Sequence, residues 1–209
     1  MKILLIDNYD SFTYNLLHLF AQIKDVEVEV VRNDAVPLDY LKNKKFHGVI
    51  IGPGPGDPSN TEYFGDNMRV IKEFGSQGLP ILGVCLGFQG LALAFGATLK
   101  QAKLPQHGKT SKLFILQTGG LFSDVPQNLE VMRYHSLMID TEKQLPKQLI
   151  ITAEVGNSSA TVKSNGREIM AFQHQSLPLY GLQFHPESFA TELGGIMANN
   201  FVDIIRARQ

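Results

Sequence analysis

Short runs of branched apolar residues alternate with longer amphipathic segments over the first half of the chain. Runs such as Val49–Ile51 contain no alternating polar residues, which is typical of strands buried on both faces of a sheet. Such strand and helix alternation predicts an α/β fold with a parallel sheet under helices. We expect strands at Lys2–Asp7, Glu27–Arg32, Gly48–Gly52 and Pro80–Val84, and helices at Ser11–Ile23, Leu38–Asn43, Glu62–Gln77 and Leu86–Phe95.

The segment from Ala97 to Tyr180 has a different texture, with short apolar runs punctuated by Gly, Pro and Asn. This pattern predicts an antiparallel or mixed extension of the sheet. The strands expected there are Leu113–Leu116, Leu149–Ala153, Ala160–Val162 and Ile169–Phe172, followed by Tyr180–Phe184 and a helix over Thr191–Ala207. We find no repeat or linker, so residues 1–209 are expected to form one domain with an open, mostly parallel sheet.

Charge and cysteine content exclude several protein classes. The sequence has 19 Lys and Arg against 20 Asp and Glu, a net charge of −1, which argues against a strongly basic nucleic-acid binder. A single cysteine cannot form a disulfide framework. The apolar run Ile3–Ile6 is too short for a secretory signal, so we expect a cytoplasmic protein and interpret the sequon Asn157–Ser159 as a polar loop.

The motif with the clearest chemistry is Gly83–Gly87, a G-x-C-x-G sequence between an apolar strand and a helix. It parallels the nucleophile elbow, in which flanking glycines let the chain bend and expose a nucleophile above the strand. The unpaired N–H groups at a helix N-terminus favour a thiolate at Cys85. The alternative is a buried, inert Cys between two packing glycines.

A cysteine nucleophile needs a base and a group that orients the base. His185 is the best candidate because it follows the last predicted strand and has Glu187 two residues further on. Pro186 biases His185 toward extended geometry, in which residues i and i+2 project to the same side. Glu187 can therefore hold the His185 ring, although a surface His and Glu pair is the alternative.

A third motif, Gly52–Pro58, alternates Gly and Pro directly after a buried strand. The free N–H groups of Gly54, Gly56 and Asp57, together with that of Leu86, could stabilise an oxyanion. The spacing matches neither a dinucleotide fingerprint nor a P-loop, and a tight loop without a ligand is the alternative. No His, Cys, Asp and Glu cluster has metal-ligand spacing, so we expect no metal or other cofactor in this chain.

These three motifs, Gly52–Pro58, Gly83–Gln89 and Phe184–Ser188, resemble those of the class I, triad-type glutamine amidotransferases in order and spacing. The resemblance implies a flavodoxin-like, three-layer fold and a reaction in which Cys85 attacks the side-chain amide of glutamine. His185 is then the acid and base and Glu187 its orienting partner. Gly56 and Leu86 supply oxyanion N–H groups.

Three further segments, Asp7–Leu16, His107–Lys109 and Arg133–Leu137, look like those of the glutaminase subunits of anthranilate synthase and aminodeoxychorismate synthase. The resemblance covers nearly the whole chain, so we expect a free-standing subunit rather than one fused to a synthase domain. It implies that the partner is a chorismate-using large subunit and that this partner needs Mg²⁺. The glutamine-binding residues that it implies are Gly54, Pro55, Gly56, Gln89, Ser136 and Leu137.

Spacing independently supports only one of these binding residues: Gln89 lies one helical turn after Cys85 and faces the same way. Ser136 and Leu137 could equally belong to a packed strand. His107 and His135 are placed near substrate or partner by the resemblance alone, and His18, His47 and His174 are expected to be structural.

The sequence departs from the family pattern at Phe88, where relatives often carry His, and over Lys112–Gln117, which is apolar. Phe88 borders Cys85, so we expect an altered substrate pocket or altered communication with a partner. The leading hypothesis is ammonia supply for anthranilate synthesis. The alternatives are the same role in aminodeoxychorismate synthesis or in both, a γ-glutamyl hydrolase or cysteine peptidase, and a non-catalytic binding domain.

Overall fold

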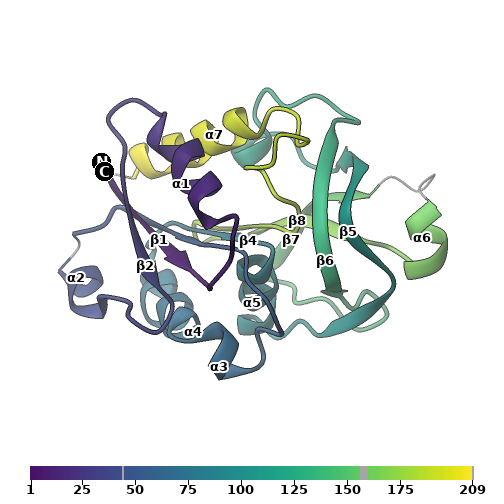
Figure 1. Cartoon of the computed structure of the whole chain (residues 1–209), viewed down its shortest axis with the longest axis horizontal. Coiled ribbons are helices and arrows are strands. Elements are labelled where there is room, and N and C mark those ends of the chain that lie inside the picture. Colours follow the sequence, from purple (N-terminus) through teal and green to yellow (C-terminus); the bar gives the residue numbers. More distant parts are fainter. Residues whose placement is uncertain (44, 156–159, 209) are drawn as a thin grey trace.

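The predicted strand and helix units form the parallel half of one curled sheet in the computed structural model, which describes residues 1–43, 45–155 and 160–208. The sheet has nine strands in the order β2-β1-β3-β4-β9-β8-β7-β5-β6 (Figure 1). All neighbours from β2 to β9 pair in parallel. These strands are β1 (Lys2–Asp7), β2 (Glu27–Arg32), β3 (Gly48–Ile51), β4 (Ile81–Val84) and β9 (Leu179–Leu182), close to their predicted bounds.

The antiparallel extension is also present, but two of its strands differ from the prediction. The segment predicted at Leu113–Leu116 is the end of a much longer strand, whose pairing with β6 shifts register on both sides of Gln106–His107. Pro105 and Gly108 break the alternation at these shifts, which explains why the pattern was not recognisable. The strands are β5 (Leu99–Ile115), the unpredicted β6 (Glu130–Ile139), β7 (Leu149–Val155) and β8 (Ile169–His174).

Helices cover both faces of the sheet, with α1 (Thr13–Ala21) and α7 (Gly194–Arg206) on one face and α5 (Leu86–Ala94) on the other (Figure 1). A short helix α2 (Leu38–Lys42) precedes β3, and a 3₁₀ turn spans Gly120–Phe122. No helix in the described part of the chain is long and apolar enough to cross a bilayer.

The prediction of one helix over Glu62–Gln77 was wrong. The segment is divided into α3 (Thr61–Phe64), α4 (Asn67–Arg69), a π-helical turn at Val70–Phe74 and a 3₁₀ turn at Gly75–Gln77. The break occurs at Gly65, which has φ +52° and lies against the backbone of Asn33. A residue with Cβ would be strained there, so the glycine allows a close approach that ends α3.

The predicted strand Ala160–Val162 was also wrong, because this segment begins helix α6 (Ala160–Asn165). At the end of this helix the Asn165 side chain accepts a hydrogen bond from Leu104 N at 2.7 Å and donates one to Leu104 O at 3.1 Å. Tertiary contact with β5 therefore overrides a local β preference. The sequon Asn157–Ser159 lies outside the described residues.

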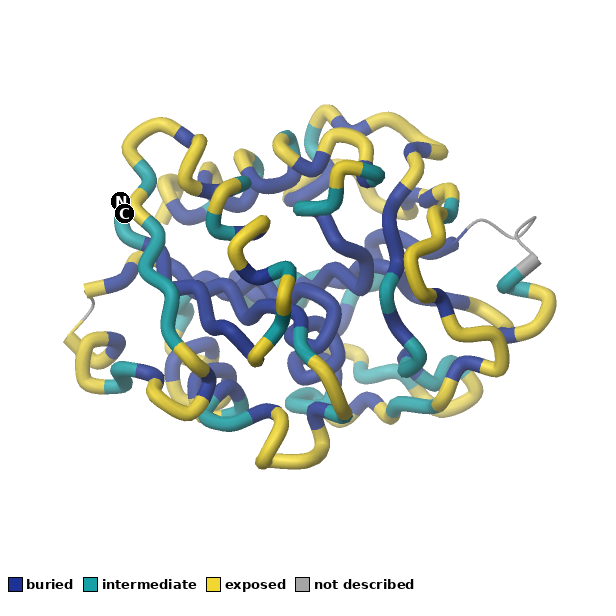
Figure 2. The backbone as a smooth tube through the Cα atoms, in the orientation of Figure 1, coloured by how far each residue is buried: buried dark blue, intermediate teal, exposed yellow. Residues whose placement is uncertain are grey.

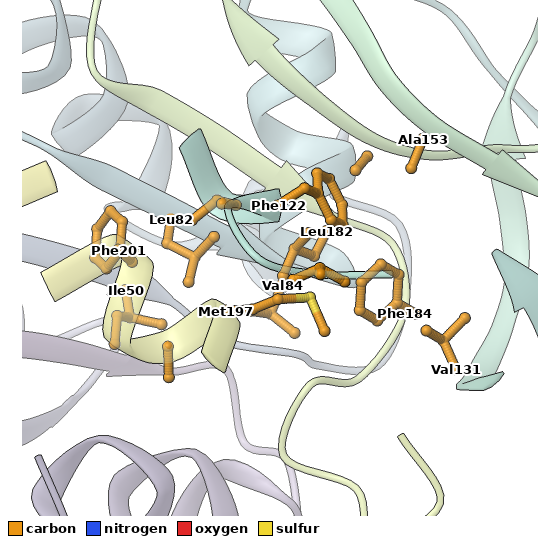
Figure 3. Packing of buried hydrophobic residues seen from close by; sticks show 14 of the residues in the cluster. Ile50, Leu82, Val84, Phe122, Val131, Ala153, Leu182, Phe184, Met197 and Phe201 are labelled. Carbon is orange, nitrogen blue, oxygen red and sulfur yellow. The ribbon is translucent and has the colours of Figure 1, made fainter. Parts of the chain in front are cut away.

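The core consists of two apolar layers, one on each face of the sheet, and the central strands are buried throughout (Figure 2). On the α7 face, Ile50, Leu82 and Val84 pack near Met197 and Phe201 (Figure 3). Burying each such side chain stabilises the fold by about 1.5–3 kcal/mol. The rigid sheet that results fixes the loops at its edge.

The carboxyl ends of β3, β4 and β9 lie side by side at one edge, since these strands are adjacent and parallel. Gly52–Pro58 follows β3, Cys85 follows β4, and Gln183–Glu187 follows β9. The topology thus brings all three sequence motifs to the edge where α/β proteins form their sites.

Candidate active site

Cys85 occupies a strained turn between β4 and α5, with φ +53° and ψ −99°. Such a conformation costs a non-glycine residue about 1–3 kcal/mol and persists only where its surroundings hold it. Here Cys85 N donates to Leu182 O at 2.8 Å, and Cys85 O accepts from Gln89 N at 3.1 Å. The predicted elbow is therefore present, and the strain falls on the cysteine itself.

The two flanking glycines allow close packing rather than unusual dihedral angles. A Cβ on Gly83 would lie 2.5 Å from the Gly87 carbonyl, and a Cβ on Gly87 would lie 2.2 Å from Ile51 O. Only glycine at both positions lets α5 start directly against β3 and β4. This packing places Cys85 at the N-cap of α5.

His185 and Glu187 form a buried pair, with 2.6 Å between His185 Nδ1 and Glu187 Oε1. The expected contact is present, but its geometry differs from the extended segment that we predicted. β9 ends at Leu182 rather than Phe184, and His185 begins a turn in which Ser188 N donates to His185 O. The carboxylate thus orients the ring from within this turn.

Charge around His185 favours its protonated form. Burial lowers the pKa of the ring, but the interactions with Cys85 and Glu187 outweigh burial and raise the pKa to about 10. His185 Nε2 is buried and has no hydrogen-bond partner among the described residues. Cys85 and His185 therefore lie close enough to interact, and Nε2 is left to exchange a proton.

Two aromatic residues that we did not predict as site residues surround the His185 ring. Tyr134 meets it edge-on, with ring centroids 5.3 Å apart, and Phe12 stacks on Tyr134 at 5.2 Å. Phe12 also lies 6.0 Å from the His185 ring. These rings limit the rotation of His185 and exclude water from it.

Cys85 opens into a cavity of about 160 Å³ that all the predicted glutamine-binding residues line. The volume is well below the about 300–1,000 Å³ typical of drug-sized ligands, which suits a small metabolite. Their roles in binding stay a prediction. The lining residues are Gly54, Pro55, Gly56, Cys85, Gln89, His107, Tyr134, His135, Ser136 and Leu137.

The loop Gly52–Pro58 is anchored at its ends and exposed at its tip. Pro53 and Pro58 are buried, whereas Pro55 and Gly56 are exposed. Asn8 Nδ2 donates to the carbonyl before Pro53 at 2.9 Å and so ties the start of the loop to the end of β1. An exposed tip between fixed ends can change position without unfolding the sheet.

Gln183 is a third residue that the sequence analysis did not predict as part of the site. It is fully buried, and its Nε2 lies 3.8 Å from Cys85 Sγ. Its Oε1 accepts from Gln89 Nε2 at 3.1 Å, and Gln89 Nε2 also donates to Leu137 O at 3.0 Å. The sequence signal that could have identified Gln183 is its position, a polar residue directly after the apolar strand β9.

His135 lines the cavity and is held neutral there. Burial and the Arg133 charge lower its pKa to about 3. Its Nε2 accepts from Arg133 Nε at 3.2 Å and its Nδ1 lies 2.9 Å from Leu137 O, which fixes Nδ1 as the donor. Arg133 is itself paired with Glu168 in a fully buried ion pair.

Phe88 does not line the cavity, contrary to the expected effect on the pocket. It is fully buried and packs on Phe172 with ring centroids 4.8 Å apart. The helical turn that directs Gln89 toward Cys85 directs Phe88 into the core.

Two other histidines make structural contacts, and a larger cavity lies away from the three motifs. His47 Nδ1 accepts from Lys2 N at 3.0 Å, and His174 Nδ1 accepts from Leu177 N at 3.0 Å, both structural contacts. A larger cavity of about 470 Å³ lies at the opposite ends of β3 and β4, near Phe46 and Pro80. Within the described ranges no group of three His, Cys, Asp or Glu side chains is arranged to hold a metal ion.

The chain is similar to known proteins over almost its whole length. The profile described as "Glutamine amidotransferase class-I" matches residues 4–205. A relative named anthranilate synthase component 2, from Leptospira biflexa, is 43% identical, and the match covers 97% of this chain and 100% of that protein. An aminodeoxychorismate synthase from Streptomyces griseus is 44% identical, with 98% of this chain matching only 26% of that protein.

A solved structure shares the fold. A protein from Thermoplasma acidophilum, described as a putative subunit of GMP synthase, superposes with a TM-score of 0.81 at 27% identity, covering 100% of this chain and 95% of that chain. The predicted α/β architecture with flanking helices is therefore confirmed by comparison as well as by the sheet order.

Proposed function

The chain belongs to the class-I glutamine amidotransferase family, and from that premise we propose that it hydrolyses L-glutamine and delivers the ammonia to a chorismate-using synthase subunit that makes anthranilate. One observation supports the glutaminase reaction above all others. A cysteine in a strained elbow and a buried His185–Glu187 pair interact beside one small cavity.

The proposed reaction starts with attack of the Cys85 thiolate on the side-chain carbonyl carbon of glutamine. The carbonyl oxygen becomes an oxyanion, for which Gly56 N–H and Leu86 N–H are the proposed donors. His185 Nε2 gives its proton to the leaving nitrogen, so ammonia departs and a γ-glutamyl thioester remains. Water, deprotonated by the same ring, then releases glutamate and restores the thiolate.

Gln89 is proposed to hold the amino-acid end of the substrate by its oxygen. Its Nε2 is already engaged by Leu137 O and Gln183 Oε1. The group left for a ligand is therefore an acceptor, which suits the α-ammonium group rather than the α-carboxylate of glutamine. Ser136 and Leu137 would contact the same end of the substrate from β6.

Partner binding is proposed to complete the site at the exposed tip of the Gly52–Pro58 loop. Pro55 and Gly56 are solvent-exposed while the loop ends are fixed, so contact with a large subunit can set the position of the Gly56 N–H. Ammonia is protonated near neutral pH, and a docked partner would also exclude water from its path.

We expect this partner subunit, rather than this chain, to require Mg²⁺, and we expect the complex to work in the cytoplasm, where a free thiol stays reduced. The second candidate is the same role in aminodeoxychorismate synthase. The Streptomyces griseus relative carries that name at 44% identity, although this chain matches only 26% of that protein. A chain shared between both partners is a third form of the proposal, and an unpartnered γ-glutamyl hydrolase or cysteine peptidase is the most distant alternative.

The proposal is tested by mixing the chain with each chorismate-using large subunit, glutamine, chorismate and Mg²⁺. Glutamate release and aromatic product are followed, with Cys85→Ala as the control. Anthranilate with one partner supports the leading form, and aminodeoxychorismate with the other supports the second. Glutamine-dependent product from Cys85→Ala, or no glutamate in any mixture, would overturn it, and cleavage of γ-glutamyl peptides without a partner would favour a hydrolase.

A further inference from the structure

We propose that Gln183 is a positioning residue for the nucleophile, whose amide N–H donates to Cys85 sulfur and favours the thiolate over the thiol. This inference deepens the proposed function, on which it rests for its catalytic meaning. Its structural basis is independent of any substrate or partner.

Gln183 lies buried between β9 and the turn that carries His185. Its side chain is fully buried, and its backbone N–H donates to Met170 O at 2.8 Å, which holds the residue against β8. An amide buried in this way must find partners or lose free energy. In the described part of the chain, the partner of its Nε2 is Cys85 Sγ, at 3.8 Å.

The orientation of the Gln183 side-chain amide follows from its partners, since the oxygen and nitrogen of an amide are told apart only by the groups they contact. Leu137 O can only accept a hydrogen bond, so the atom of Gln89 that faces it at 3.0 Å is the nitrogen. The same nitrogen faces one end of the Gln183 amide at 3.1 Å, which must then be the oxygen. The nitrogen of Gln183 is thereby left facing the sulfur.

The Leu137 carbonyl anchors the two amides of Gln89 and Gln183. Leu137 O lies within hydrogen-bond distance of both Gln89 Nε2 and His135 Nδ1, at 3.0 and 2.9 Å. The Nδ1 position carries the proton because His135 Nε2 accepts from Arg133. Arg133 is fixed by its buried pair with Glu168. The orientation of both amides is therefore set by groups that do not change during the reaction.

The Cys85 sulfur gains a hydrogen bond from the Gln183 N–H when it is ionised. As a thiol, Cys85 can donate to Tyr134 O at 3.7 Å. As a thiolate, Cys85 can no longer donate, and its negative charge faces the partial negative charge of the Tyr134 carbonyl oxygen. The Gln183 N–H compensates, because a hydrogen bond to an ionised acceptor is stronger than one to a neutral thiol. Gln183 thus acts on the ionisation of Cys85 and need not touch the substrate.

The test is the pH dependence of Cys85 alkylation by iodoacetamide in the intact chain, which has a single cysteine. Gln183→Met keeps the volume and removes the donor. Gln183→Glu keeps the acceptor for Gln89 and turns a carboxylate oxygen toward sulfur. Gln173→Met on β8 is the matched control. Circular dichroism and thermal melting show whether each variant is folded.

We expect the midpoint of the alkylation profile to rise by about one pH unit in Gln183→Met. Below the midpoint, the alkylation rate of this variant is then about tenfold lower than that of the wild type, because its thiolate fraction is about tenfold lower. The midpoint should rise further in Gln183→Glu and stay unchanged in Gln173→Met. Absorbance of the thiolate near 240 nm, followed through the same titration in the wild type and the folded variants, gives a second readout of ionisation.

Equal midpoints in the wild type and Gln183→Met would overturn the inference whatever the midpoint of Gln183→Glu, because a carboxylate raises the midpoint through its charge alone. If Gln183→Met does not fold, Gln183→Leu, which also lacks the donor, takes its place, and an unchanged midpoint in Gln183→Leu overturns the inference. Neither result depends on a large subunit or on glutamine. A failed synthase assay therefore leaves this inference standing, and an unchanged alkylation profile leaves the glutaminase proposal standing.

Discussion

Gly194 packs so closely on Pro186 that a Cβ added to the glycine would lie 1.9 Å from Pro186 O. This contact joins the start of α7 to the turn that carries His185 and Glu187. A methyl group on Gly194 must displace one of the two backbone segments, because the nearest atoms all belong to the backbone of Pro186 and not to a flexible side chain.

Gly194→Ala should therefore lower glutaminase activity of the assembled complex about tenfold or more and reduce the free energy of unfolding by about 1–3 kcal/mol. Gly195→Ala is the control, because a Cβ at that position would meet no atom within 4 Å. Activity and urea unfolding are measured for both variants. Equal activities in the two would show that the Gly194 contact does not position the His185 turn.

Glu187→Gln tests the electrostatics of His185. Burial lowers the pKa of this ring, while Cys85 and Glu187 raise it to about 10. A neutral amide removes part of the raising effect, so the pKa of His185 should fall in the variant. Without the carboxylate to stabilise the imidazolium, activity should fall about 10²-fold, within the usual range for an acid and base group.

The same pKa sets the pH range over which His185 stabilises the fold. The folded value of about 10 lies above the ordinary value of 6.5. The His185 contribution to the free energy of unfolding is therefore fully present below about pH 6.5 and is lost as pH rises toward 10. NMR titration of the ring in the wild type and in Glu187→Gln measures both values, and coincident titrations would contradict the assigned role of Glu187.

His135 should have the opposite effect on stability. Burial and Arg133 lower its folded pKa to about 3, so the unfolded chain binds a proton that the folded chain does not. Its contribution is present above about pH 6.5 and is lost as pH falls toward 3, by at most about 1.4 kcal/mol per pH unit. Urea unfolding at pH 7.5 and 5.5 should show a smaller loss in His135→Asn than in the wild type. An identical loss would rule out His135 as its source.

The sequence allowed the parallel half of the sheet and the three motifs to be predicted, because each depends on local pattern. Continuous apolar strands such as β3 indicate burial by their composition, the glycines around Cys85 indicate an elbow, and Glu187 lies only two residues after His185. Because β3, β4 and β9 are parallel and adjacent, the three motifs that follow them meet at one edge of the sheet.

What could not be predicted depends on contacts between distant segments. Gly65 ends α3 because Asn33 lies against it, and α6 is a helix whose Asn165 bonds β5. The contact of Gln183 with Cys85 joins residues that follow adjacent strands but are 98 positions apart. No periodicity encodes such pairings, so Gln183 was overlooked although it directly precedes the recognised motif Phe184–Ser188.

Asn8 should stabilise the Gly52–Pro58 loop through both ends of its amide. Its Nδ2 donates to Gly52 O at 2.9 Å, and its Oδ1 accepts from Asn33 at 3.0 Å and from Asn67 at 2.6 Å, all buried. Asn8→Asp keeps the acceptor and loses the donor, whereas Asn8→Leu loses both. We expect losses of about 1–3 kcal/mol for each unsatisfied buried group, so Asn8→Leu should be the less stable variant in guanidinium unfolding. Stabilities equal to wild type in both would show that the loop is held by its prolines alone.

Phe189 is 98% exposed although it is a large aromatic residue, and it lines a small cavity with Phe12, His185 and Glu187. Exposed aromatic side chains beside a site are typical anchors of protein interfaces. Under the proposed function, Phe189→Ser should leave the stability of the free chain unchanged and weaken large-subunit binding about tenfold or more. A truncation of an interface anchor usually has an effect of that size.

The control for this prediction is Tyr40→Ser, since Tyr40 is 46% exposed and lies on α2, whose Leu41 and Lys42 line the cavity at the opposite ends of the strands. Titration calorimetry with the large subunit gives both affinities. If the two variants bind equally well, the partner does not dock over the triad. Closure of the Gly52–Pro58 loop would then have to be driven by glutamine, because a ligand shifts a conformation only through differential contact with it.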